Sequence, residues 1–95
     1  MSIFRANGNG NGTVVTAGVP VQLPMINCSK VLITASDQNI DLIAVGDPSV
    51  SALNRIGAML QPSFSQWFNV SSLNQLFIDA LDDGAKFSYY YEIGS

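Results

Sequence analysis

Three aspartates near the C-terminus, Asp79, Asp82 and Asp83, come closest in type and spacing to a reactive site. Clustered carboxylates can chelate calcium, and two of them can act as acid and base in glycoside hydrolysis. Their spacing matches no calcium-binding loop, and Asp-Asp-Gly is a sequence that turns prefer in any case. The cluster therefore favours a turn, with a metal site and a catalytic pair as weaker alternatives.

Other reactive groups are scarce. The 95 residues include no histidine and a single cysteine, Cys28. Without histidine the chain lacks a common zinc ligand, the imidazole general base and the usual partner of a nucleophilic serine or cysteine. A lone cysteine makes no disulfide framework, and a buried thiol is its ordinary role. We therefore expect no enzyme activity, no metal and no cofactor.

Charge and hydropathy restrict the partners. Four basic residues stand against seven acidic ones, and the basic residues are scattered singly. Nucleic-acid binding needs a clustered basic surface, so we expect no nucleic-acid partner. We also expect no membrane partner and no secretion signal, since no apolar run approaches the roughly 20 residues of a membrane span. With 12% charged and 47% hydrophobic residues, the chain is poorly protected against association.

The segment from Leu76 to Ile93 (LFIDALDDGAKFSYYYEI) predicts an antiparallel hairpin. Two runs rich in β-branched and aromatic residues flank the turn at 82–84. Alternation gives the two strands one apolar face and a second face that carries Phe77 and Tyr90. A sheet that is apolar on one side and half apolar on the other indicates docking onto another surface.

Similar strand patterns recur along the chain, at 13–17, 21–23, 30–35, 41–46 and 64–70. Residues 50–60 predict an irregular loop with room for one helical turn. About eight short strands at intervals of roughly ten residues predict an all-β fold, an antiparallel β-sandwich or jelly roll. Residues 13–95 would form this single domain. Residues 1–12 would form a flexible or draped N-terminal arm, because the run NGNGNG has no side chain able to hold a core.

Several apolar side chains are expected to point outward from the strands, and we treat them as a candidate protein interface. Two more apolar residues lie at the tip of the expected arm. The candidate interface residues are Ile3, Phe4, Leu32, Trp67, Phe77 and Tyr90. An apolar patch of this kind marks a partner or a ligand. Two alternatives remain: burial of these side chains beneath the loop at 50–60, and a sugar-binding platform in which Trp67 and a tyrosine stack on a ring.

Taken together, short segments after about Thr13 resemble the pattern of a family of small phage virion proteins. The main matching segments are 15–23 (VTAGVPVQL), 28–33 (CSKVLI), 43–46 (IAVG), 57–63 (GAMLQPS) and 73–80 (LNQLFIDA). The family pattern runs T-x-A-G-T-P-V-x-L, C-K-x-V-x-I, I-Y-V-G, G-x-x-L-x-P-G-E-S-V and L-x-x-L-Y-I-D-A, and the shared order of the segments carries the likeness. The chain departs from the pattern at Ala44, Ser63 and Phe64, where the family has tyrosine, glycine and glutamate.

The resemblance implies a virion structural protein. In its simplest form this is a capsid decoration (cement) protein that stabilises the head by binding between capsid subunits. Its partners would be its own copies, most simply in a trimer, and the major capsid protein. It would be made in the host bacterial cytoplasm and would end up on the capsid surface. The alternatives are a neck or tail component and a carbohydrate- or host-receptor-binding module.

Overall fold

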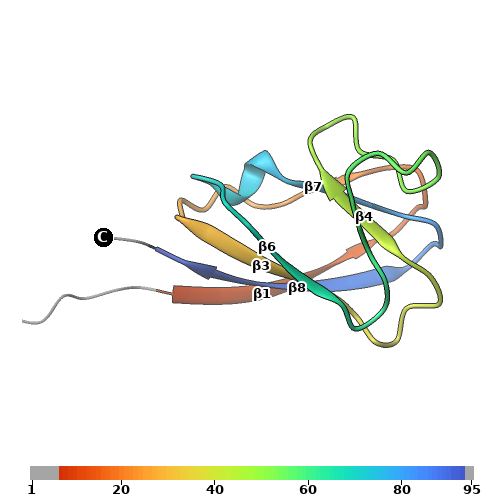
Figure 1. Ribbon diagram of the computed structural model, residues 1–95, viewed down its shortest axis with the longest axis horizontal. Helices are drawn as coiled ribbons and strands as arrows, with labels where there is room; N and C mark the ends of the chain where they lie inside the picture. Colours follow the sequence, from red (N-terminus) through yellow and green to blue (C-terminus); the bar gives the residue numbers. More distant parts are fainter. Residues whose placement is uncertain (1–6, 94–95) are drawn as a thin grey trace, which may run out of the picture.

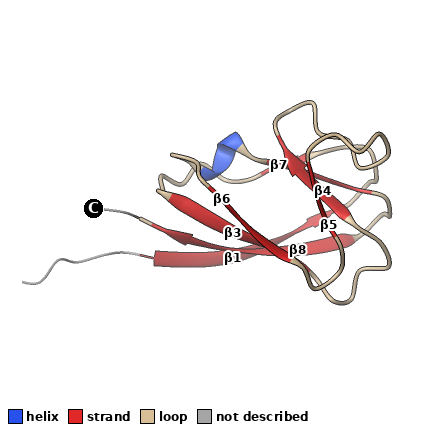
Figure 2. Ribbon diagram, in the orientation of Figure 1, coloured by secondary structure: helices blue, strands red, loops and turns tan. Residues whose placement is uncertain are grey.

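The computed structural model describes residues 7–93, and within them eight strands form two sheets that face each other (Figure 1). In spatial order, the first sheet consists of β1 (Asn7–Val14), β8 (Ala85–Glu92), β3 (Lys30–Ala35) and β6 (Ser65–Phe68). The second consists of β2 (Val21–Gln22), β7 (Phe77–Ala80), β4 (Ile43–Gly46) and β5 (Ala58–Leu60). All strand pairs are antiparallel, and a short 3₁₀ turn, η1 (Leu73–Gln75), precedes β7 (Figure 2). The expected all-β fold is confirmed, and its two antiparallel sheets are compatible with the expected β-sandwich.

The core lies between the two sheets. Val31 and Ile33 point inward from β3, while Ile43, Val45 and Ile78 point inward from the second sheet, and none is more than 1% exposed. Along β3 buried and half-buried residues alternate, as the sequence predicts for 30–35. Each such side chain stabilises the fold by about 1.5–3 kcal/mol relative to an exposed position.

The strands pair in a nested order. β1 pairs with β8, β2 with β7, β3 with β6 and β4 with β5. The hairpin predicted over Leu76–Ile93 is therefore wrong in its pairing, although both strands and the turn are present. The connection at 81–84 crosses from the second sheet to the first, with Gly84 at a φ of 80°. A turn signal does not reveal whether the chain returns to the same sheet. Here the pairing was determined by β1 and β2, which are far from β7 and β8 in the sequence.

From residue 7 onward the expected arm is instead strand β1, and this corrects the sequence interpretation. Asn7–Val14 is in continuous register with β8. Gly8, Gly10 and Gly12 lie directly opposite three aromatic residues, namely Tyr91, Tyr89 and Phe87. A Cβ atom on each of these glycines would lie 2.5 Å from Cζ of the ring opposite. The rings thus cover the glycine backbone and supply the side-chain packing that β1 lacks. Ile3 and Phe4 lie outside the described residues.

The connection between β4 and β5, residues 47–57, folds back over the outer face of the second sheet (Figure 1). A second apolar cluster lies beneath it, with Leu42, Ala44, Val50 and Ala52 at its centre. We call this segment the covering loop. The irregular loop expected at 50–60 is therefore correct up to residue 57, but 58–60 form strand β5, which the sequence interpretation missed.

Candidate functional site

The outer face of the first sheet carries a row of three apolar side chains from neighbouring strands. Leu32 of β3 lies between Tyr90 of β8 and Trp67 of β6, directly in register with both. Trp67 is 44% and Tyr90 36% exposed. Their ring centres are 6.3 Å apart and nearly perpendicular, which is a favourable edge-to-face arrangement. We call Leu32, Trp67 and Tyr90 the aromatic row. It brings together three of the six candidate interface residues.

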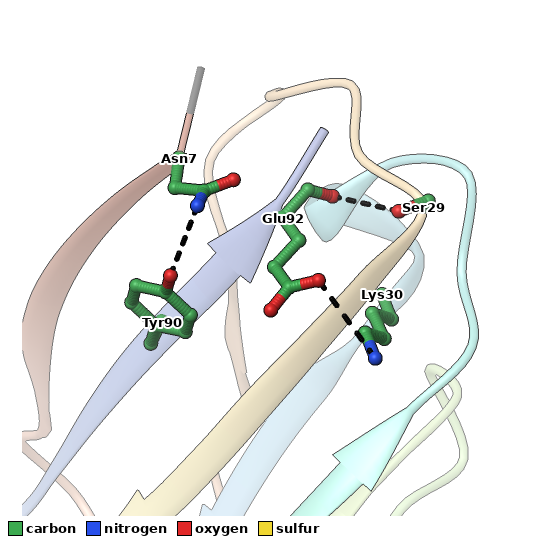
Figure 3. Close-up of polar contacts among 5 residues, drawn as sticks. All are labelled: Asn7, Ser29, Lys30, Tyr90 and Glu92. Atoms are coloured by element: carbon green, nitrogen blue, oxygen red, sulfur yellow. Dashed lines mark hydrogen bonds and ion pairs between the residues drawn. The ribbon is translucent and has the colours of Figure 1, made fainter. Parts of the chain in front are cut away.

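Polar contacts surround the aromatic row, and Figure 3 shows those made by Tyr90, Lys30 and Glu92. The Nδ2 group of Asn7 donates a hydrogen bond to the Tyr90 hydroxyl at 3.0 Å. Lys30 Nζ lies 4.7 Å from the centre of the Trp67 ring and 3.7 Å from a carboxylate oxygen of Glu92. Contacts of this kind between exposed groups contribute about 1 kcal/mol or less each. They restrict the rotamers around the row, which lowers the entropy cost of binding a partner.

A polar groove of about 620 Å³ continues along the same face. Thr34 follows Leu32 by two positions and Ser88 precedes Tyr90 by two, so both point to the outer face beside the row. The polar residues that line the groove are Asn11, Thr13, Thr34, Ser36, Asp37, Ser63, Lys86 and Ser88. They offer hydroxyl groups, one side-chain amide, one cation and one carboxylate. The groove therefore suits recognition by hydrogen bonds.

Phe77 lies apart from the aromatic row, on the outer face of the second sheet. Its half-buried side chain packs against the apolar cluster beneath the covering loop. For Phe77 the structure therefore agrees with the alternative to an interface, in which the side chain lies beneath the loop. The physical reason is that the covering loop supplies Val50 and Ala52, which bury the apolar outer side of β4 and β7.

Asp79 has a structural role that the sequence interpretation missed. It is 2% exposed, and its two oxygens accept hydrogen bonds at 2.9 Å from the backbone N–H groups of Gly18 and Ala52. Asp83 Oδ1 accepts one from Ala17 N at 2.7 Å. Within residues 7–93 no group of three or more metal-ligating side chains is placed to hold an ion. An aspartate inside the apolar strand FIDA was the available signal, because buried carboxylates require partners.

Cys28 is half-buried and packs against the core. Its thiol donates to the carbonyl oxygen of Val70 at 3.4 Å. Burial raises the pKa of the Cys28 thiol, which disfavours the thiolate that a nucleophile requires. The geometry supports a packing role for this residue.

No protein-family model, no curated protein and no solved structure matches this chain. In the part of the chain that the structure describes, no helix has the length and apolar character needed to cross a membrane. The aromatic row and the adjoining groove are the surface features that indicate a binding function.

Proposed function

We propose that the chain is a structural protein of a phage virion, most simply a capsid decoration (cement) protein. It would bind between capsid subunits on the head surface as a homo-oligomer, with the major capsid protein as its other partner. The observation that carries this proposal is the aromatic row, an ordered apolar strip on an outer sheet face. Tryptophan and tyrosine are enriched at the centres of protein interfaces, where they contribute most of the binding energy.

The nested strand pairing supports the finer fold assignment that the proposal includes, a jelly roll. In that fold a long antiparallel ribbon is wrapped into two sheets, so that the first strand pairs with the last and each inner pair follows inside it. The order β1-β8-β3-β6 facing β2-β7-β4-β5 fits such a ribbon. Jelly rolls are common among viral capsid domains and lectins.

The turn between β5 and β6 supports the resemblance to small virion proteins. Phe64 N donates to the carbonyl oxygen of Gln61 at 2.9 Å, and Ser63 has a φ of 75°. A turn with proline in its second position and a positive φ in its third is a type II turn, which prefers glycine at that third position. The family pattern has glycine there. Ser63 therefore adopts the positive φ that the glycine of the family pattern favours, although the residue itself differs.

Attachment to phage heads tests the proposal. The Trp67→Ala variant should bind heads of the phage that encodes the chain roughly tenfold or more weakly in co-sedimentation. Leu53→Ala is the matched control, because Leu53 is a 77% exposed apolar residue on the covering loop, away from the aromatic row. Unchanged attachment of a folded Trp67→Ala variant would contradict the proposal. Removal of residues 1–6 tests Ile3 and Phe4, whereas removal of 1–12 would also delete most of β1.

The groove favours a second candidate function, a carbohydrate- or host-receptor-binding module. Its lining of hydroxyl groups, one amide and the opposite charges of Lys86 and Asp37, beside two exposed aromatic rings, suits a neutral sugar, which stacks on a ring and accepts and donates hydrogen bonds. Trp67 is the only tryptophan of the chain, so its fluorescence reports binding directly. Titration with a panel of neutral glycans should give a saturable change that Thr34→Ala weakens. A flat response across the panel would exclude this function.

A further inference from the structure

The free edge of β1 is a second surface with an unusual sequence. β1 lies at one end of the first sheet and pairs with β8, and no other strand of the described residues lies beside its opposite edge. Its eight residues, NGNGNGTV, include no charged residue and no proline, and its register with β8 contains no bulge. Charges, prolines and bulges are the devices by which natural proteins protect an edge strand from pairing with another chain. This long edge has none of them.

The side chains of β1 are suited to meeting their own copies. Asn7, Asn9 and Asn11 point to the outer face and are exposed, while the glycines between them lie under the rings of β8. An asparagine amide carries both donors and acceptors, so it can bond to another asparagine. The chain as a whole has a net charge of −3, which disfavours most self-contacts, but the neutral β1 edge adds no repulsion of its own.

We propose that two copies of this chain pair through β1, antiparallel across a two-fold axis perpendicular to the first sheet. Each copy adds its four strands, and the result is one continuous sheet across both copies. This axis keeps both outer faces on the same side, so asparagines oppose asparagines and glycines oppose glycines. The two aromatic rows then lie on one side of the dimer and form a bivalent surface.

The inference rests on the self-association in the proposed function, and it adds the surface and the symmetry. A two-fold contact gives an even number of copies, whereas the trimer that the resemblance implies has an odd number. Native mass spectrometry of the full chain distinguishes them, and the expected species is a dimer or a multiple of it. A trimer, or a monomer at all concentrations up to about 100 µM, where interfaces of ordinary strength are formed, would overturn the inference.

Paired charge variants test the edge itself. Asn9→Lys with Asn11→Lys places like charges across the axis and should give monomers, as should Asn9→Asp with Asn11→Asp. An equal mixture of the two variants should restore dimers that contain one copy of each. Asn7 is left unchanged because it binds Tyr90. Ser65→Lys is the matched control, because Ser65 is exposed on the outer face of β6, the other edge strand of the same sheet, and this variant should remain dimeric.

A measurement on the unaltered chain does not depend on how the variants fold. Protection of the β1 backbone amides from hydrogen exchange should rise with protein concentration, while protection in β6 should stay constant. Constant protection in β1, or dimers that persist in both charge variants, would overturn the inference. The proposed function would survive that result if Trp67→Ala still weakened attachment to heads. The proposed function would fail, and the inference would stand, if β1 paired as described and the chain did not attach to heads.

Discussion

Both sheets carry apolar side chains on their outer faces, but these side chains have different surroundings. On the second sheet, Ala44 and Phe77 lie beneath the covering loop, which contributes Val50 and Ala52 to the same cluster. On the first sheet, Trp67 and Tyr90 are exposed beside a groove. The difference teaches that an outward apolar residue indicates an interface only where the chain does not bury that residue itself.

The covered face depends on Asp79, and its removal should have the largest effect on stability. Asp79→Ala leaves the N–H groups of Gly18 and Ala52 without their acceptors. Hydrogen bonds to a charged group contribute about 1.5–3 kcal/mol each, so the free energy of unfolding should fall by about 3 kcal/mol in urea denaturation. Asp83→Asn, in which an acceptor oxygen remains for Ala17, is the control and should change it by about 0.5 kcal/mol or less. Equal effects of the two variants would mean that Asp79 does not anchor the loops.

The first sheet, whose outer face no loop covers within the described residues, should lose stability when a glycine of β1 is replaced. Replacing a strand glycine by alanine ordinarily stabilises a protein by about 0.5–1 kcal/mol. Gly10→Ala should instead destabilise this protein by about 1–2 kcal/mol, because the new Cβ would collide with the Tyr89 ring and force it to move. The measurement is thermal unfolding, and the control is Asn9→Ala, on the solvent side of the same strand. The control changes the strand propensity without displacing a ring. A stabilised Gly10→Ala variant would show that the ring does not pack on the glycine.

The turn that joins the two sheets between β5 and β6 should accept a stabilising change. Ser63 has a positive φ, which costs a residue with a side chain about 1–2 kcal/mol. Ser63→Gly removes that cost but raises the entropy of the unfolded chain, so the expected net gain is about 1 kcal/mol or less. Ser63→Ala, which keeps the strain, should give no gain. A destabilised Ser63→Gly variant would contradict the turn geometry.

The smallest effect concerns pH and the start of the covering loop. The pKa of Asp47 is lowered because the hydroxyl and the N–H group of Ser49 donate to its carboxylate. A pKa lower in the folded than in the unfolded chain means that the contribution to stability is present above the unfolded value and is lost as pH falls through the folded value. The difference in stability between the unaltered chain and Asp47→Ala should therefore shrink below about pH 4. A difference that stays constant between pH 7 and pH 2 would contradict this assignment.

Local pattern predicted much of this fold. The strand at 30–35, the outward position of Leu32 and the turn at 82–84 lie where the sequence predicts them. Strand alternation also identified Trp67 and Tyr90 as outward residues. What it missed depends on distant partners: the glycines of β1 could be interpreted as an arm because their covering rings lie about 80 residues away in the chain.

The sequence by itself determined strands β2, β3, β4, β6, β7 and β8, the turn at 82–84 and which side chains of these strands share a face, since these follow from the two-residue period of a strand and from turn chemistry. Tertiary structure alone decided that β7 and β8 join different sheets, that Phe77 packs against the cluster beneath the covering loop and that Asp79 ties two loops together. These outcomes require contacts between segments far apart in the chain. No local pattern specifies which of several compatible surfaces will meet.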